Sequence, residues 1–378
     1  MKTAERLAIN PAAAPETGGL PVSSRNIWFY DSYDIRLIET PLPKLKDDEL
    51  LCRSVRSLIS QGSEVVKYTR EMDDSMHKKA RESGAPFMGG YANSAEVLAV
   101  GKNVKGFQVG EKLACSVPHN EFFTVHPDYV THTPAWVTHE ENAWMTMLRT
   151  GLYACMQASL KPYESVLIAG AGTFGMCALM LARIYNARRI VVAEPDAYRA
   201  SLAETMGASR VLRGRIGDLV PEALAANDGR YYDVAIDATA WAGNIRHLQA
   251  CVKNGGNISI IADPPDTDKQ IMDYGFFHYR GQHVHGTFID MQIPSCPAGG
   301  RELYNQFYPF TLQDCHDFLY EKMRTGELDV KRLIAGCVSP ADCAKVFDRL
   351  YRDRGSLLGL EYDWTLLNSE APPAPPAT

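Results

Sequence analysis

The segment from Val166 to Glu194 places the strongest constraint on how this chain can fold. It contains an apolar run, a glycine-rich turn with the sequence GAGTFG, a helix-length stretch, and a second apolar run that ends at the acidic residue Glu194. The glycines are Gly170, Gly172 and Gly175, a spacing that permits a tight turn, close approach of a ligand to the backbone, and close packing of helix on strand. The order strand, turn, helix, strand and acid predicts a dinucleotide site, with the pyrophosphate at the N-terminus of the helix.

The acid at the end of this segment indicates which dinucleotide is preferred. Glu194 can accept hydrogen bonds from the adenosine ribose hydroxyls and would repel a 2′-phosphate, so NAD is favoured over NADP. Arg199 follows closely and could face a phosphate, whereas the alternative role for such a residue is a solvated position on a helix. The residues predicted to bind the cofactor are Gly170, Gly172, Thr173, Phe174, Gly175, Glu194, Arg199, Ala238, Thr239, Ala262 and Thr287.

Two other glycine-rich sites fit this turn less well. A methyltransferase normally has an acid just before the glycines, where this chain has Ile168 and Ala169. A phosphate-binding P-loop needs Gly-Lys-Ser/Thr at the turn, and residues 173–175 do not provide it.

Composition limits the classes of partner. With 378 residues, of which 46% are hydrophobic, the chain can bury a substantial core and is expected to hold two domains. A net charge of -6 gives no basic footprint for nucleic acid, and no apolar run approaches the roughly 18 residues of a membrane span. The nine cysteines are dispersed, and residues 1–21 lack the apolar block of a secretory signal. We therefore expect a cytoplasmic protein with a small-molecule substrate, and neither a nucleic acid nor a membrane as partner.

The chain divides into a β-rich part and an alternating α/β part. Up to about residue 143, short apolar runs punctuated by glycines predict strands, and from Trp144 onward helical stretches alternate with short apolar strands. The predicted elements are strands at Ile35–Ile38, Leu50–Val55, Glu96–Val100, Lys112–Cys115, Asp233–Asp237 and Asn257–Ile261, and a helix at Gln313–Arg324. We expect a flexible arm at 1–25, a β-rich domain at 26–143 and 327–368, a doubly wound parallel-sheet domain at 144–326, and a disordered Pro/Ala-rich tail at 369–378.

Several motifs occur in a recognisable order. They are DIRL with the turn PLP, the segment EVLAVGKNVKGFQVG, the nucleotide fingerprint, and VSP followed by AKVF near the C-terminus. In this order the chain resembles the medium-chain dehydrogenase/reductase superfamily, the relatives of alcohol dehydrogenase, over nearly its whole length. The resemblance implies an α/β fold with a GroES-like β-rich catalytic domain and a Rossmann domain, hydride transfer as the chemistry, and a homodimer.

The resemblance breaks at the metal site. Zinc members of the superfamily carry a Cys before Gly-Thr-Asp, a Gly-His-Glu, and a later Cys or Asp. Here Gln61 stands in place of the Cys, Tyr91 in place of the His, and neither Cys nor Asp lies near Thr146; the four-cysteine structural lobe is also missing. We therefore expect an enzyme without zinc. The segments ISQGSE and GYANSAEV more closely resemble a zinc-free branch that includes the bacteriochlorophyllide hydroxyethyl dehydrogenases and related bidomain oxidoreductases.

Without a metal, another group must accept the hydroxyl proton during hydride transfer. Tyr91 would place a phenol in the space of the lost ligand, and a packed aromatic ring is its alternative role. His119 matches the segment that lines the substrate pocket in this superfamily, and an imidazole can transfer a proton near neutral pH; a histidine held by a backbone partner is the alternative. We predict Tyr91, His119 and Gln61 as catalytic residues, and Ser60 and Asn120 as substrate-binding residues.

The predicted function is interconversion of a secondary alcohol, including cyclic and sugar-like ones, and a ketone by hydride transfer with NAD. Three alternatives remain open: reduction of an activated carbon-carbon double bond with NAD(P)H, a redox-neutral lyase that oxidises its substrate transiently, and a non-catalytic module that senses nucleotide.

Three further features have plain structural interpretations. The histidines of HYRGQHVHG, His278, His283 and His285, are expected at a sheet surface or a subunit contact rather than on a metal. Asp237 and Asp263 are expected to cap turns. The stretch 291–310 looks longer than the usual family connection and is expected to cover the pocket or build a dimer contact.

Overall fold

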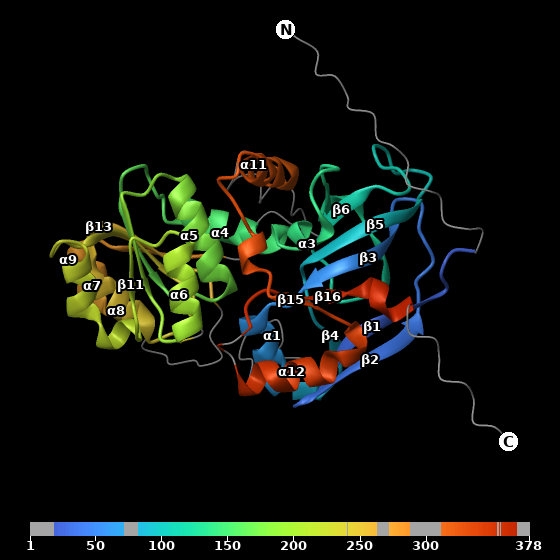
Figure 1. Cartoon of the computed structure of the whole chain (residues 1–378), viewed down its shortest axis with the longest axis horizontal. Coiled ribbons are helices and arrows are strands. Elements are labelled where there is room, and N and C mark those ends of the chain that lie inside the picture. Colours follow the sequence, from blue (N-terminus) through green and yellow to red (C-terminus); the bar gives the residue numbers. More distant parts are fainter. Residues whose placement is uncertain are drawn as a thin grey trace, which may run out of the picture.

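The chain folds into two lobes that meet along one side of each (Figure 1). The computed structural model describes residues 19–71, 82–239, 241–262, 272–287, 311–353, 355 and 357–368. The expectations for Asp263, for the stretch 291–310 and for the tail at 369–378 lie outside these residues. No helix in the described part is long and apolar enough to cross a membrane.

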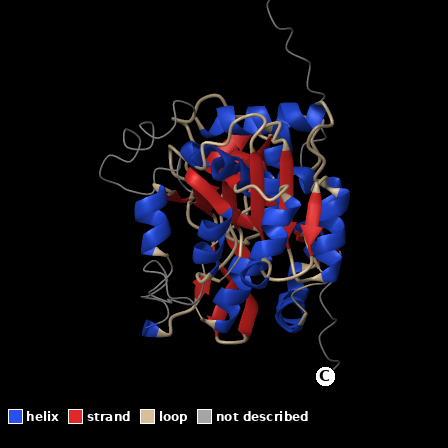
Figure 2. Cartoon of the chain, turned by 90° about the vertical axis from the view of Figure 1, so that its left-hand side faces the viewer, coloured by secondary structure: helices blue, strands red, loops and turns tan. Residues whose placement is uncertain are grey.

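One lobe is built on a six-stranded parallel sheet with the order β11-β10-β9-β12-β13-β14. Its strands are β9 (Ser165–Ala169), β10 (Arg189–Ala193), β11 (Arg210–Leu212), β12 (Tyr232–Asp237), β13 (Val252–Ile260) and β14 (His283–Gly286). Its helices are α4 (Met145–Gln157), α5 (Thr173–Ile184), α6 (Ala197–Thr205), α7 (Val220–Ala226), α8 (Asn244–Cys251) and α9 (Tyr274–Arg280). Figure 2 shows helices on both sides of the strands, as expected of a doubly wound sheet.

The central strand β9 explains why this sheet has two cores. Every residue of β9 is buried, and alternate side chains enter different hydrophobic clusters. Val166 and Ile168 pack with α4 and α5 on one face, whereas Leu167 and Ala169 pack with α7 and α8 on the other. A strand with both faces covered needs a continuous apolar run, which is what the sequence provides.

In the residues that the structure describes, the second lobe holds a seven-stranded sheet, a three-stranded sheet and the two longer helices whose bounds follow. The larger sheet has the order β15-β16-β3-β5-β6-β8, with β7 paired to β3. Its strands are β3 (Leu50–Leu58), β5 (Asn93–Val100), β6 (Lys112–Cys115), β7 (Phe122–Val125), β8 (Val130–His132), β15 (Gly336–Val338) and β16 (Leu360–Asp363). The smaller sheet has β1 (Ser23–Asp31), β2 (Asp34–Pro41) and β4 (Phe87–Met88), and the helices are α1 (Gln61–Thr69) and α12 (Cys343–Arg352).

The chain returns to this lobe at its end, because β16 pairs antiparallel with β3. Helix α11 (Leu312–Arg324) lies against α4, and the short helix α3 (His139–Asn142) leads from the β-rich lobe into α4. The chain therefore crosses between the lobes twice, once before the parallel-sheet lobe in the sequence and once after it.

The predicted strands and the α11 helix are confirmed, with differences at the boundaries. The mixed α/β class, with a GroES-like lobe and a Rossmann lobe, is confirmed as well. The expected flexible arm at 1–25 was too long, because β1 already begins at Ser23. Arg25 is fixed in that strand by a two-pronged ion pair with Glu121, with bonds of 2.6 and 2.7 Å, which anchors the strand start.

A buried carboxyl group lies where the two lobes join. Glu361 on β16 is fully buried, and its Oε1 accepts a 3.0 Å hydrogen bond from the indole Nε1 of Trp144, which directly precedes α4. Burial raises the pKa of Glu361 to about 8, and the negative charge of Glu140 contributes to the increase. The folded protein therefore holds a proton on Glu361 that the unfolded chain gives up at much lower pH.

This buried acid predicts how stability depends on pH. Because the pKa is raised by folding, its favourable contribution is complete at acidic pH, below the ordinary value of 4.5, and is lost as the pH rises toward 8. Glu361→Gln mimics the neutral acid and can still accept from Trp144. We expect the wild type to lose a few kcal/mol of unfolding free energy relative to this variant between pH 5 and 8. Thermal unfolding across that range measures it, with the exposed Glu222→Gln as control, and parallel curves for wild type and Glu361→Gln would contradict it.

Candidate active site

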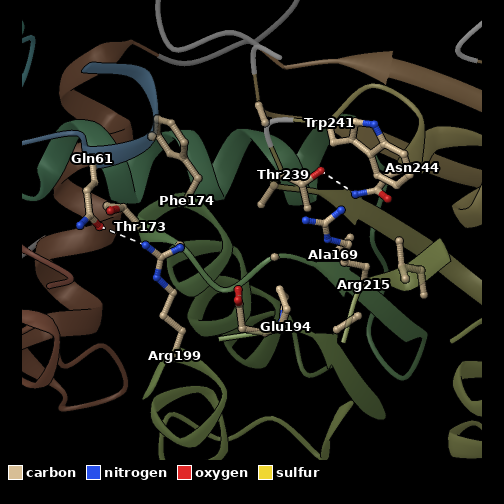
Figure 3. A pocket seen from close by; sticks show the side chains of 18 of the residues that line it. Gln61, Ala169, Thr173, Phe174, Glu194, Arg199, Arg215, Thr239, Trp241 and Asn244 are labelled. Carbon is tan, nitrogen blue, oxygen red and sulfur yellow. Dashed lines mark hydrogen bonds between the residues drawn. The ribbon is translucent and has the colours of Figure 1, made fainter. Parts of the chain in front are cut away.

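A cleft of about 510 Å³ lies between the lobes, at the carboxyl ends of β9, β10 and β12 (Figure 3). One wall is formed by the start of α1, with Ser60, Gln61 and Ser63. The other is formed by the glycine turn, the end of β10 and the turns after β11 and β12. Parallel α/β sheets bind ligands at this edge, so the cleft is the first candidate for a functional site.

The glycine turn has the conformation that its spacing predicts. Gly170 has a φ of 87°, in the region that favours glycine. A Cβ on Gly175 would lie 2.0 Å from the carbonyl oxygen of Gly170, so α5 packs too closely on β9 for any side chain there. Gly172 is the N-cap of α5, and a Cβ on it would meet nothing nearer than Arg199, at 3.9 Å. The free N–H groups at the start of α5 face a space that an anion can enter.

Glu194 directly follows β10, with its carboxylate fixed beside this turn. The residue is only 4% exposed. Its Oε2 accepts a 2.6 Å hydrogen bond from the backbone N–H of Ala171, and its Oε1 accepts a 2.8 Å bond from that of Asp196. A carboxylate has about four acceptor positions, so capacity remains for ribose hydroxyls. The acid is therefore held rigidly where the sequence predicted the adenosine ribose.

Two arginines line the same part of the cleft. Arg199, on the first turn of α6, donates from Nη2 to Oε1 of Gln61 at 3.3 Å, which bridges the two lobes (Figure 3). It is thus part of the cleft wall, and the alternative role as a solvated helix residue does not hold. Arg215, just after β11, also lines the cleft and was not found from the sequence. These guanidinium groups add positive charge beside Glu194, which a phosphate group could use.

The turn after β12 completes this wall. The buried Asp237 accepts hydrogen bonds from the backbone N–H and the hydroxyl of Thr239, at 3.0 and 2.7 Å, so it caps a turn as predicted. Burial raises the pKa of Asp237 to about 6. Asn244 donates to the Thr239 hydroxyl at 2.7 Å, and Ala238 and Thr239 both face the cleft.

The remaining predicted cofactor residues lie in three places. Thr173, Phe174 and Ala262 line the cleft. Gly175 lies behind the turn. Thr287 does not line the cleft; its hydroxyl is hydrogen-bonded to Ser259 at 2.7 Å. Residues that line the cleft but were not predicted are Gly62, Ser63, Ala169, Ala193, Pro195, Arg215, Ile216, Trp241 and Asn244.

Tyr91 lies against the α1 wall of the cleft. Its hydroxyl donates to Oγ of Ser60 in a very short hydrogen bond and lies 3.3 Å from Oγ of Ser63. Both serines line the cleft, whereas Tyr91 is half-buried beside them and does not itself line it. The predicted pair of Tyr91 and Ser60 is therefore brought together, with Ser63 as a third hydroxyl. Ser63 was not predicted, because its approach to Tyr91 depends on α1 being a helix.

His119 is not in the cleft, contrary to the prediction. It is fully buried, with Nδ1 2.8 Å from Oγ of Ser57 and Nε2 3.0 Å from Oε2 of Glu64. The Ser57 hydroxyl also accepts from Trp364, at 2.9 Å, and the second oxygen of Glu64 accepts from the backbone N–H of Ser60, at 2.8 Å. Both ring nitrogens are thus used within the protein, and the network holds the start of α1 in place.

Asn120 also fails to reach the cleft. It is 7% exposed and forms an isolated backbone bridge with Asn26 of β1. The predicted substrate contact is therefore wrong for this residue. Asn120 directly follows His119 in the sequence. It therefore lies beside the buried network of His119 and bridges to β1, away from the cleft wall.

The residues present do not fit a zinc ion. In the described part of the chain, no three His, Cys, Asp or Glu side chains come together in a group that could hold a metal. The side chains at the expected ligand positions are engaged otherwise: Gln61 with Arg199, and Tyr91 with Ser60. The buried imidazole of His119 and the carboxylate of Glu64 bind each other. The pair of His283 and His285 stacks on β14 at 6.1 Å between ring centroids.

Comparison with known proteins identifies relatives of the same architecture. Residues 174–298 match the family model described as zinc-binding dehydrogenase. The chain is 24% identical to sorbitol dehydrogenase of Bacillus subtilis over 312 residues, which is 71% of this chain and 86% of that one. It is 22% identical to L-threonine 3-dehydrogenase of Photorhabdus laumondii over 365 residues, 87% and 96% of the two chains.

Solved structures show the same fold. The 2R,3R-butanediol dehydrogenase of Bacillus subtilis superposes with a TM-score of 0.72 at 18% identity, covering 90% of this chain and 99% of that one. Benzyl alcohol dehydrogenase of Acinetobacter calcoaceticus superposes with a TM-score of 0.74 at 15% identity, with the same coverage.

Proposed function

We propose that this chain, an oxidoreductase similar to the medium-chain zinc-binding dehydrogenases, interconverts a secondary alcohol and a ketone with NAD and without zinc. One observation carries the proposal. The cleft has a dinucleotide turn with a fixed acid on one wall, and Ser60 and Ser63 on the other, where both hydroxyls are hydrogen-bonded to Tyr91. The first provides for a hydride carrier, and the second for the proton that hydride transfer leaves behind.

NAD, when bound, would supply the hydride acceptor for the alcohol carbon. The N–H groups at the start of α5 and the guanidinium of Arg199 would hold its phosphates, and Glu194 would accept from its adenosine ribose. The hydrogen bond between Tyr91 and Ser60 joins two hydroxyl groups through which a proton could pass. In alcohol oxidation the hydroxyl proton would pass to the phenolate form of Tyr91, directly or through Oγ of Ser60, and in ketone reduction the phenol would return it.

The substrate class is supported by the relatives. Sorbitol, L-threonine and 2R,3R-butanediol dehydrogenases are named for substrates that share a secondary hydroxyl group. Hydroxyl groups on the α1 wall suit a polar substrate of this kind, including cyclic and sugar-like alcohols.

A direct assay tests the function. We expect NADH to form when the protein is mixed with NAD and a panel of polyols, 3-hydroxy acids and cyclic secondary alcohols, with kcat/KM higher for NAD than for NADP. Activity should persist after dialysis against a zinc chelator. Metal analysis of the dialysed protein shows whether zinc has been removed. Loss of activity on chelation, restored by zinc, would overturn the zinc-free part of the proposal. Tight NAD binding without turnover on any alcohol or ketone would instead favour a nucleotide-sensing module.

The two arginines of the cleft wall support a second candidate function, an NADPH-dependent reductase. Arg199 and Arg215 beside Glu194 would suit a 2′-phosphate, and NADPH is the common cofactor of zinc-free reductases of activated carbon-carbon double bonds in this superfamily. Oxidation of NADPH by an enone, with no reaction of secondary alcohols, would favour this reductase. Product formation without net change in NADH would favour a redox-neutral lyase.

A further inference from the structure

Helix α1 presents polar side chains along one face. Ser60 is its N-cap, and Ser63 and Lys67 follow at intervals of three and four residues, which places all three on the same side of the helix. Tyr91 lies on that side: its hydroxyl contacts both serines, and its ring lies under the Lys67 ammonium, with 5.6 Å between Nζ and the ring centroid. Glu64, on a different face of the helix, turns to His119 instead.

We propose that Lys67 is a positioning residue for the proton transfer, which stabilises the ionised form of the Tyr91 phenol. A positive charge within about 6 Å of an aromatic ring is attracted to its face, and it favours an anion formed there. Both side chains are half-buried, so water screens the interaction less than on an open surface. This inference rests on the proposed function, in which the Tyr91 and Ser60 pair accepts the substrate proton.

The charges around Tyr91 support this direction. On the same helix, the carboxylate of Glu64 accepts from the backbone N–H of Ser60 and pairs with the buried His119 on the other side, so its negative charge is engaged away from the phenol. His119 packs against Gly90, where a Cβ would lie 2.5 Å from the imidazole ring, and its Nε2 already contacts Glu64. Lys67 is the charged group on α1 that faces the Tyr91 ring.

In alcohol oxidation the C–H bond breaks, and its electron pair leaves as hydride to the nicotinamide of NAD, which is reduced. The O–H bond of the alcohol breaks as its proton passes to the phenolate oxygen of Tyr91, directly or through Oγ of Ser60, and a ketone forms. Lys67 neither gains nor loses a proton, and its charge makes the phenolate available at lower pH.

The experiment compares Lys67→Met with Lys67→Arg in the full-length protein. Met removes the charge but retains the aliphatic stem, whereas Arg retains the charge. Lys102→Met is the matched control, because Lys102 is exposed and paired with Asp47 far from this helix face. Thermal unfolding of each variant shows whether it folds; if Lys67→Met does not, Lys67→Gln takes its place.

The first readout needs no substrate. With 3-fluorotyrosine incorporated at position 91, fluorine NMR follows ionisation of that phenol alone. We expect its midpoint to rise by about one pH unit in Lys67→Met and to stay near the wild-type value in Lys67→Arg and Lys102→Met. An unchanged midpoint in Lys67→Met would overturn the proposal.

The second readout is the pH dependence of kcat. Its acid limb should move to higher pH by the same amount in Lys67→Met, with about tenfold slower turnover at pH values below the limb, while Lys67→Arg restores the wild-type profile. A uniform decrease of kcat at every pH would indicate a merely structural role and would overturn the proposal. If the wild type turns over no alcohol, the proposed function fails, and the fluorine titration still decides whether Lys67 acts on Tyr91.

Discussion

Tyr91→Phe is expected to lower kcat for alcohol oxidation by about 100- to 10,000-fold, the contribution typical of a positioned proton-transfer group. The substitution removes only the hydroxyl, which bonds to Ser60 and lies 3.3 Å from Ser63, so the ring keeps its packing against the core. Because the cofactor turn lies on the other lobe, NAD affinity should stay within about threefold of the wild-type value. Steady-state NADH formation and fluorescence titration with NAD measure the two effects.

The control for this prediction is Tyr163→Phe, since Tyr163 is 73% exposed and lies on the surface of the parallel-sheet lobe. It should leave kcat unchanged. If Tyr91→Phe also leaves kcat unchanged while the wild type is active, the proton is taken by another group, and the Tyr91 and Ser60 pair is structural.

Gly175→Ala is expected to lower the free energy of unfolding by about 3 kcal/mol and to abolish NAD binding in the fraction that folds. Its Cβ would lie 2.0 Å from the carbonyl oxygen of Gly170 and 3.4 Å from Cβ of Ala238, so α5 must move away from the turn. Forcing extra atoms into a close-packed contact costs about 1 to 3 kcal/mol, and a backbone atom cannot turn aside as a side chain can. Urea unfolding and NAD titration measure both losses.

Gly172→Ala separates the fold from the cofactor in the same turn. A Cβ at this position meets nothing within 3.9 Å, and the φ of −72° suits alanine, so stability should stay within about 0.5 kcal/mol of the wild type. NAD affinity should still fall at least tenfold, since the second glycine of this motif allows the pyrophosphate to approach the backbone. Equal NAD affinity in Gly172→Ala and wild type would contradict the predicted cofactor site.

The parts of the fold that were predicted well depend on local patterns. The four apolar residues of β9 and the β6 strand were found from their sequence alone, because apolar runs bounded by turn residues form strands wherever a sheet can receive them. Helix α1 was missed. Its sequence QGSEVVKYT has a mixed pattern, and the helix is held by contacts of Glu64, Val65 and Tyr68 with distant segments. The start of β1 was missed for the same reason, since Arg25 is fixed by Glu121.

In the candidate site, too, local features could be predicted and contacts between distant segments could not. The roles of the residues in the turn could be predicted, whereas the residues of the α1 wall could not be assigned correctly one by one. His119 and Asn120 were placed in the pocket because of where the family segment lies, but the imidazole is enclosed by Ser57, Glu64 and Tyr362. Cytoplasmic location and a homodimer remain predictions from the sequence.

Local sequence was enough to predict the dinucleotide half of this protein. Gly170, Gly172, Gly175 and Glu194 lie within one short segment, and glycine spacing and an acid at a strand end act through the local backbone. The tertiary structure alone decided which side chains complete the other half. Tyr91, in the connection between β4 and β5, meets Ser60 and Lys67 at helix α1, and Arg199 reaches Gln61 from the opposite lobe, because packing between distant segments sets these distances.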